Sequence, residues 1–400
     1  MDDSVVRPPS SRLHSIDAVR GLVMILMALD HVRGFFGGTG GPENLATTTP
    51  ALFLTRWVTH ICAPTFVLLA GTAAWIYGSK GRTKGELATF LWTRGLWLVF
   101  LELTVVSFGW VHFFGFVFWQ VIAAIGVAMI ALAGIVFLPH LLIVALGLLI
   151  VGGHNLLDPL EQADFGAYSE VWHFLHEGFW VQFGLVDAGL AQILVVYPVL
   201  PWIGVMALGY AIGPLTKLEP ARRKKTFLAL GFALTVGFIA LRAVNGYGDP
   251  SPWESQADPS RTWISFLKCT KYPPSMLFSM MTLGPMFLLL GLLDRKPGKL
   301  TDMLIVFGRV PLFYYVAHIF LISYGSRLYH WLTFGESVSI SNSAMAGLHP
   351  NFQQLPKGFE GMSLSEFYVA WIVVVVLLYP LCVWYGRVKG ASKSRWFSYL

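Results

Sequence analysis

One stretch near the start of the chain carries a fixed cation and a titratable base on the same side of a predicted helix. In Ser15–Phe36 (SIDAVRGLVMILMALDHVRGFF), Arg20 and His31 are eleven residues apart. At about 100° per residue, this spacing brings the two side chains back to within about 20° of one direction. Asp17, Met24 and Met27 lie on the same face. A histidine suits proton transfer near neutral pH, and an arginine about 16 Å away along the axis suits anion binding.

Further ionisable residues stand in apolar stretches, where we expect them at the same level as His31. His60 follows RWVT, His318 lies in GRVPLFYYVAHIFL, Glu102 lies in a third stretch, and Asp30 directly precedes His31. Ionisable groups inside membrane segments are costly and are functional candidates by default. We therefore take these five residues as catalytic candidates. The histidines, and Glu102 above all, could instead serve as hydrogen-bond partners between helices.

Three arginines are candidates for binding a phosphate-bearing cofactor. Arg20, Arg94 and Arg309 lie in or next to apolar segments, toward the predicted cytoplasmic side. A guanidinium group binds phosphate oxygens through two parallel hydrogen bonds. For Arg20, the alternative is that its side chain extends to the inner lipid headgroups.

No metal site is predicted. His173 and His176 (HFLH) have a spacing that one helical face could use for a metal, but the spacing fixes no third ligand. The three cysteines, Cys62, Cys269 and Cys382, form no C-x-x-C pair. Neither a zinc site nor a disulfide framework follows from such a pattern.

The composition indicates whether these segments face water or lipid. Hydrophobic residues make up 55% of the chain and charged residues 12%, against about 25% charged residues in a soluble domain. We predict an all-α, polytopic bundle embedded in a lipid bilayer, with no cleavable signal peptide because the first fifteen residues are polar. In such a protein the net charge of +6 orients the helices, so no nucleic-acid partner is expected.

About ten segments are long enough to cross a bilayer, which takes about 20 apolar residues. We place them near 17–36, 57–78, 87–109, 117–137, 140–156, 192–215, 226–243, 274–293, 303–324 and 367–386. With both termini in the cytoplasm, 18 of the 28 Lys and Arg residues face inside, as the positive-inside rule requires. The outer loop 157–191 holds six acidic residues and no Lys or Arg. The predicted organisation is a cytoplasmic tail 1–16, a transmembrane domain 17–386 and a cytoplasmic tail 387–400.

The pattern of an Arg, ten residues and a His in a first span, introduced by SIDAVRGL, resembles the transmembrane acyltransferase superfamily. The chain is most similar to bacterial relatives of the heparan-α-glucosaminide N-acetyltransferase catalytic domain. The matching stretches are RLHSIDAVRGLVMILMALDH (12–31), FLTRWVTHICAPTFVLLAG (53–71), YPVLPWIGVMALGYAIG (197–213), KYPPSMLFSMMTLGP (271–285) and GRVPLFYYVAHIFL (308–321).

The resemblance implies transfer of an acetyl group from cytoplasmic acetyl-CoA, a substrate and not a resident cofactor, to an amino or hydroxyl group of an extracytoplasmic glycan. It implies a bacterial inner-membrane protein and a catalytic histidine. Arg20 and His31 match the superfamily's Arg and His, and His318 matches the histidine of the family's late Tyr-Val-x-His helix. The lysosomal enzyme carries Asn where His31 stands and uses a histidine in the next loop. Loop 37–50 here contains no histidine, so His31 or His60 takes that role.

Two other functions fit the same residues. A transporter or exporter would use them as a substrate or proton path, although the sequence shows no inverted repeat of the kind found in many transporters. A scaffolding membrane subunit would not need ionisable groups aligned across the bilayer. A homodimer is compatible with the sequence, which identifies neither the acyl group nor the acceptor.

Overall fold

The structure is a computed structural model that describes residues 13–37, 41–181, 192–337, 359 and 361–392. Most of the predicted cytoplasmic tails lie outside these residues, as does much of the segment between the predicted spans 303–324 and 367–386. Within them, the α-helices are α1 (His14–Phe36), α2 (Pro50–Thr59), α3 (Cys62–Gly78), α4 (Lys84–Leu101), α5 (Ser107–Val111), α6 (Val121–Ile135), α7 (His140–Gly153), α8 (Ser169–Trp172), α9 (Val199–Ala211), α10 (Pro220–Val244), α11 (Pro259–Leu267), α12 (Met276–Leu292), α13 (Lys299–Gly308), α14 (Pro311–Phe334) and α16 (Leu364–Ala391). Tighter or wider helical turns are η1 (Glu102–Val106), η2 (His154–Leu157), η3 (Gln162–Tyr168), η4 (His173–Glu177) and η5 (Gly213–Lys217), and the strands are β1 (Phe116–Trp119), β2 (Phe179–Val181) and β3 (Gln192–Val195).

The predicted all-α membrane bundle is confirmed, and the chain is an integral membrane protein. Among the described residues, six helical segments are long and apolar enough to cross a membrane, and the bent pair α13–α14 would make a seventh. The shorter apolar helices α6 and α12 also match predicted spans, as does α1, which carries several charges. The number of about ten spans stays a prediction.

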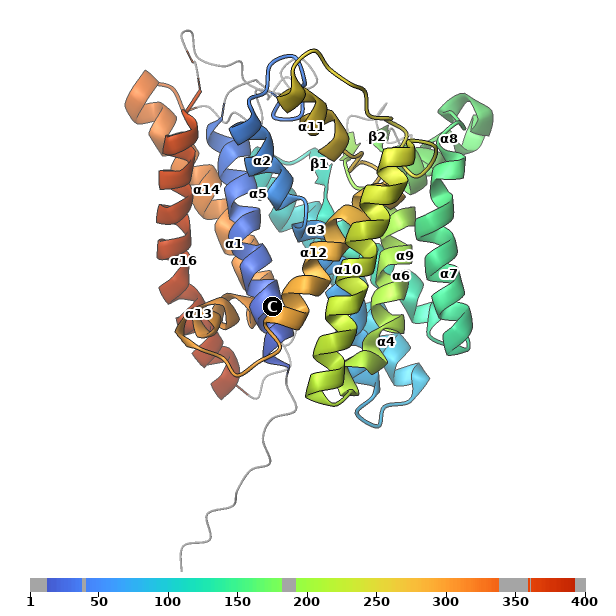
Figure 1. Ribbon diagram of the computed structural model, residues 1–400. Helices are drawn as coiled ribbons and strands as arrows, with labels where there is room; N and C mark the ends of the chain where they lie inside the picture. The colour runs from blue at the N-terminus through green and yellow to red at the C-terminus, as the bar shows by residue number, and fades with distance from the viewer. Residues whose placement is uncertain (1–12, 38–40, 182–191, 338–358, 360, 393–400) are drawn as a thin grey trace, which may run out of the picture.

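The outward faces of the bundle are apolar. On α16, Val369, Val376 and Trp384 leave more than half of their surface exposed, at 63, 62 and 58%. Lipid tails can cover such a face, whereas a soluble monomer rarely exposes so large an apolar surface. Figure 1 shows α1 beginning and α16 ending at the lower side of the bundle, which agrees with termini on one side of the membrane.

Three predicted spans differ from the observed elements. The spans predicted at 117–137 and 192–215 begin as strands β1 and β3, because short runs rich in β-branched and aromatic residues fit a strand as well as a helix. The strands pair in the order β1-β3-β2, with β1 and β3 parallel. The span predicted at 303–324 is broken, since α13 and α14 meet at 83° just before Pro311, whose ring prevents the helix from continuing.

Helix α1 lies inside the bundle, where it packs against α3, α13, α14 and α16. Its approach to α13 is closest at two glycines. A Cβ on Gly21 would lie 1.8 Å from the Leu304 backbone oxygen, and a Cβ on Gly308 would lie 1.8 Å from that of Asp17. Only glycine fits at either position, so the two backbones touch and α1 is held firmly at its N-terminal end.

Candidate functional site

The site is built around a direct contact between His31 on α1 and His318 on α14. Nδ1 of His31 lies 2.7 Å from Nε2 of His318. Nδ1 of His318 in turn lies 3.0 Å from the backbone oxygen of Tyr314, one turn earlier in α14. The edge of the His31 ring also packs against Trp110. The predicted convergence of His31 with another candidate is thereby confirmed for His318.

These contacts fix which nitrogen of each ring carries a proton when both rings are neutral. A carbonyl oxygen only accepts, so Nδ1 of His318 is the donor to Tyr314 and its Nε2 is left with a lone pair. That lone pair must accept from Nδ1–H of His31. Nε2 of His31 is therefore unprotonated, as a general base or nucleophile requires. His318 orients His31, much as the third group of a catalytic triad orients its base.

A small cavity of about 30 Å³ lies beside His31 and is lined by further polar groups, among them Asp30, Gln120, Tyr197 and Lys271. The parallel pairing of β1 with β3 explains two of them. Trp119 and Val195 are paired at the carboxyl ends of the two strands, so Gln120 and Tyr197, which follow, reach the same cavity.

Lys271 enters the cavity from the segment that leads into α12. It is 7% exposed, and its ammonium group lies 5.1 Å from the ring centre of Tyr272 and 5.9 Å from that of Tyr197. A short bridge between Lys271 and Pro274 holds this segment in place. A buried cation next to an unprotonated imidazole can stabilise a developing oxyanion.

Three cavities follow one another along α1. The outer one, at His31, shares Phe66 and Val121 with a middle cavity of about 360 Å³. The middle cavity shares Arg20 with an inner one of about 1050 Å³. The predicted face of α1 lines all three: Asp17 and Arg20 the inner, Arg20 and Met24 the middle, Met27 and His31 the outer. The face of α1 predicted from the sequence thus lines a path of cavities from the N-terminal end of the helix to His31.

Two of the three arginine candidates lie on this path. Arg20 lines the inner and middle cavities, and Arg94 lines the middle one. The guanidinium group of Arg20 also donates to the Gly308 backbone oxygen at 3.3 Å. Arg309 is exposed at the end of α13 and does not line these three cavities.

Asp30 and His60 belong to an ion-pair network at the outer end of the site. Asp30 pairs with Arg33 at 3.1 Å and closely with Arg56. Arg56 also binds Glu43 at 3.0 Å, and Glu43 accepts a hydrogen bond from Nε2 of His60 at 3.0 Å. Burial alone would raise the pKa of the Glu43 carboxyl, but the His60 hydrogen bond and the Arg56 charge outweigh it and lower that pKa well below its usual range.

His60 therefore lies in this ion-pair network and not at the cavity beside His31. Its Nε2 is occupied by Glu43, its Nδ1 is buried, and it does not line the cavity at His31. Glu102 is likewise held by a structural contact: its carboxylate accepts from the Ala123 backbone N–H at 3.0 Å, in the first turn of α6. The first N–H groups of a helix need such an acceptor, and the widened turn η1 directs Glu102 toward them.

Sequence reasoning did not select Lys271, Gln120 or Tyr197. Lys271 and Tyr197 each open one of the stretches quoted for the family resemblance, and that position was the available signal. The predicted spans place Lys271 in an outer loop, where its charge bears only on topology. The sequence around Gln120 gives no sign that it lies at the site, because its position in the cavity depends on the pairing of β1 with β3.

A comparison with protein families gives a match over the first part of the chain. The sequence model described as "Heparan-alpha-glucosaminide N-acetyltransferase, catalytic" matches residues 12–241, more than half of the chain. The match includes Arg20, His31 and Arg94, and it ends before Lys271 and His318. No curated protein sequence matches the chain.

Proposed function

This chain belongs to the heparan-α-glucosaminide N-acetyltransferase catalytic family, a family of transmembrane acetyltransferases, and we propose that it transfers an acetyl group from cytoplasmic acetyl-CoA. The proposed acceptor is an amino or hydroxyl group of a glycan on the outer side of a bacterial inner membrane. The observation that carries the proposal is the hydrogen-bonded chain from His31 through His318 to the Tyr314 carbonyl, at the end of a path of cavities lined by Arg20. This chain leaves Nε2 of His31 with a lone pair that can act as a base.

The donor fits the inner part of this path. The inner cavity is lined by Arg20, Lys80 and Lys217, and the middle cavity by Arg20 and Arg94. These cations can bind the phosphates of CoA. The pantetheine arm would then extend along α1 over the roughly 16 Å to His31, through the largely apolar middle cavity.

The reaction assigns a role to each group at the outer cavity. Nε2 of His31 takes the proton of the acceptor N–H or O–H as the acceptor attacks the thioester carbonyl. The carbonyl oxygen gains negative charge, which Lys271 stabilises with Gln120 as a second hydrogen-bond donor. Breakdown of the tetrahedral intermediate breaks the C–S bond, and the CoA thiolate receives the proton from His31.

Access to the base differs for the two substrates. The outer cavity, about 30 Å³, has room for little more than a water molecule. The acceptor therefore has to displace side chains of the outer segments that carry Tyr197 and Lys271. The acetyl group, which is smaller, reaches the same point from the middle cavity.

The test uses the full chain purified in detergent or nanodiscs. Acetyl-CoA at a hundredfold excess over its Kd should stabilise the protein by about 2.7 kcal/mol. Incubation with labelled acetyl-CoA and a panel of amino sugars and oligosaccharides should give a labelled product. Arg20→Ala should weaken acetyl-CoA binding roughly ten- to a hundredfold, the worth of a charge-assisted contact of about 1.5–3 kcal/mol. Arg309→Ala, the matched control, should bind as the wild type does.

A transporter gives a different outcome. It would show no stabilisation by millimolar acetyl-CoA and no labelled product, while substitutions along the path would lower the flux of another solute. Such a result would overturn the proposal.

A further inference from the structure

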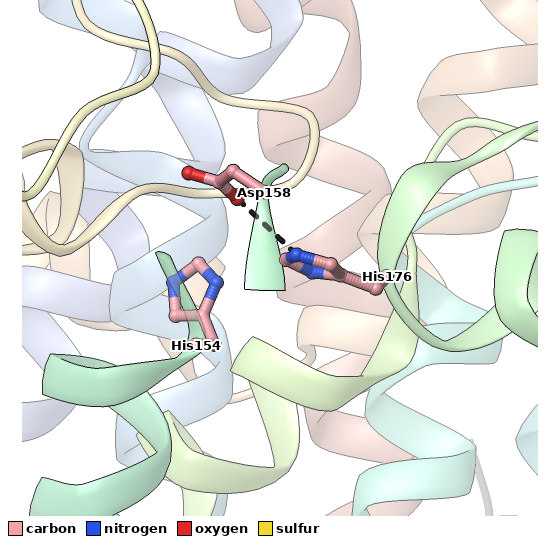
Figure 2. A group of neighbouring side chains, drawn as sticks. All are labelled: His154, Asp158 and His176. Carbon is pink, nitrogen blue, oxygen red and sulfur yellow. Dashed lines mark ion pairs between the residues drawn. The ribbon is translucent and has the colours of Figure 1, made fainter. Parts of the chain in front are cut away.

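A second group of ionisable side chains lies at the outer end of α7, away from the cavities along α1. It consists of His154 and Asp158, four residues apart around η2, and His176 from η4. One potential ligand atom from each residue lies within 4.8 Å of those of the other two. Figure 2 shows the three side chains directed toward a common point from two separate segments. Nε2 of His176 is already 3.2 Å from Oδ1 of Asp158.

His154 is the least satisfied of the three. It is 2% exposed, and neither ring nitrogen makes a well-formed hydrogen bond within the described part of the chain, although the Pro274 carbonyl interacts with the ring. Nδ1 of His176 is buried without a partner in the same sense. Buried polar atoms are nearly always hydrogen-bonded, and an exception indicates a function or an ion.

The surroundings favour a cation. The predicted outer loop 157–191 holds six acidic residues and no Lys or Arg. The side chain of Asp158 is 18% exposed, so the group can be reached from solution. A loop whose charged side chains all have the same sign raises the local concentration of ions of the opposite charge.

From these observations we propose that His154, Asp158 and His176 bind a Zn²⁺-class divalent transition metal. Two imidazoles and one carboxylate are typical zinc ligands, with three protein ligands leaving one position of a tetrahedral site open. Bond lengths of about 2.0–2.1 Å place tetrahedral ligand atoms about 3.3 Å apart. The His176–Asp158 pair at 3.2 Å already has that spacing. His154 has a ligand atom within 4.8 Å of both partners, so a small change in the position of its ring would bring in the third ligand.

Asn155 joins this site to the start of α12. The side-chain amide of Asn155 donates to Oδ2 of Asp158 at 2.8 Å, and its oxygen accepts from the Met276 backbone N–H at 2.9 Å. Such contacts orient metal-binding carboxylates. The ion would therefore fasten the outer segment 154–177 to the beginning of α12, close after Lys271. The sequence pattern missed this group because it pairs His173 with His176, whereas the fold pairs His176 with His154 and Asp158.

His173 provides a matched control, since it lies in the same turn η4, is similarly buried at 7% exposed, and pairs with Glu177 outside the group. The tag-free full chain, stripped with chelator, is titrated with Zn²⁺ against a competing chromophoric chelator. Wild type and His173→Ala should bind one Zn²⁺ per chain. His154→Ala and His176→Ala should bind more than about 100-fold more weakly, since loss of a second-shell contact alone costs up to about that factor.

Thermal unfolding keeps the proposal testable if a variant folds poorly. Zn²⁺ should raise the Tm of wild type and His173→Ala, and chelator should reverse the rise. Equal binding by all variants, or a wild-type chain that neither binds Zn²⁺ nor changes its Tm, would overturn the proposal. Neither result bears on acetyl-CoA binding, so the metal site and the acetyl transfer are tested separately.

Discussion

Replacing His31 by alanine distinguishes most clearly between the reaction end of the site, at His31, and the donor-binding end, at Arg20. The change removes the proposed base, whose lone pair is fixed by the contact with His318, while the cations that would hold CoA stay in place. General-base catalysis contributes about 10²–10⁴-fold, so the transition state should lose about 2.7–5.4 kcal/mol at 1.36 kcal/mol per tenfold. Because His31 lies roughly 16 Å from Arg20 along α1, acetyl-CoA affinity should change by less than about twofold.

The assay measures transfer of labelled acetyl from acetyl-CoA under single-turnover conditions, next to acetyl-CoA binding on the same preparation. His60→Ala is the informative companion, because the family pattern leaves either histidine as the base. His60 is tied to Glu43 and does not line the cavity at His31, so its loss should leave the rate within about tenfold of wild type. Single-turnover rates isolate the chemical step from product release.

The reverse pattern would refute this reasoning. If folded His31→Ala kept a rate within threefold of wild type while His60→Ala abolished transfer, the base would be His60 and the hydrogen-bond argument for His31 would fail. Loss of acetyl-CoA binding in His31→Ala would also contradict the separation of donor and reaction ends.

Three further predictions concern packing, pH and topology. Gly21→Ala should destabilise the protein by about 1–3 kcal/mol through overpacking, because the new Cβ would lie 1.8 Å from an α13 backbone oxygen. Gly34→Ala is the control in the same helix, since a Cβ there meets nothing within 4 Å. Equal melting temperatures for these two variants would be inconsistent with the α1–α13 contact. Burial, followed by the Arg327 charge, lowers the pKa of His112 from 6.5 to about 4, so the unfolded state binds more protons below pH 6.5 and stability falls from there toward pH 4. The Tm of wild type should therefore drop more between pH 7 and pH 5 than that of His112→Gln, and an equal drop would rule out this contribution. Accessibility tags at Arg82 and Phe165 should be cytoplasmic and external, respectively, and labelling of both from the same side would contradict the topology.

The functional face of α1 could be predicted because it depends only on local geometry. A helix repeats every 3.6 residues, so the alignment of Arg20 with His31 follows from their spacing, and the cavities confirm the face that they share. The segment around His318 was also recognisable. Its contact with His31 was expected only as one of several alternatives, since spacing within one helix does not determine which helices pack together.

The missed parts of the site depend on contacts between distant segments. Gln120 and Tyr197 meet because β1 pairs with β3, some 76 residues later in the chain. The segment before α12 places Lys271 in the cavity beside His31. From the sequence, a cation outside a predicted span bears only on the topology. Glu102 was selected for being ionisable in an apolar segment, and the structure shows it accepting a backbone N–H of α6. An ionisable residue in a membrane helix therefore indicates a specific polar contact. Only the packing of the helices shows whether that contact belongs to a reaction site or, as for Glu102, caps the first turn of another helix.

The packing of α1 also bears on whether the site works as a fixed channel or by alternating access. A transporter exposes one central site to each side in turn, by rocking or gating one group of helices against another. The two glycine contacts bring the α1 and α13 backbones together near the N-terminal end of α1, and the His31–His318 bond joins α1 to α14 farther along. Rotation or sliding of α1 would break both contacts at once. The proposed acetyl transfer would need no such movement, because the donor would enter from one side and the acceptor from the other, to meet at Nε2 of His31. The close packing of the helix that carries both Arg20 and His31 therefore favours the enzyme over the transporter.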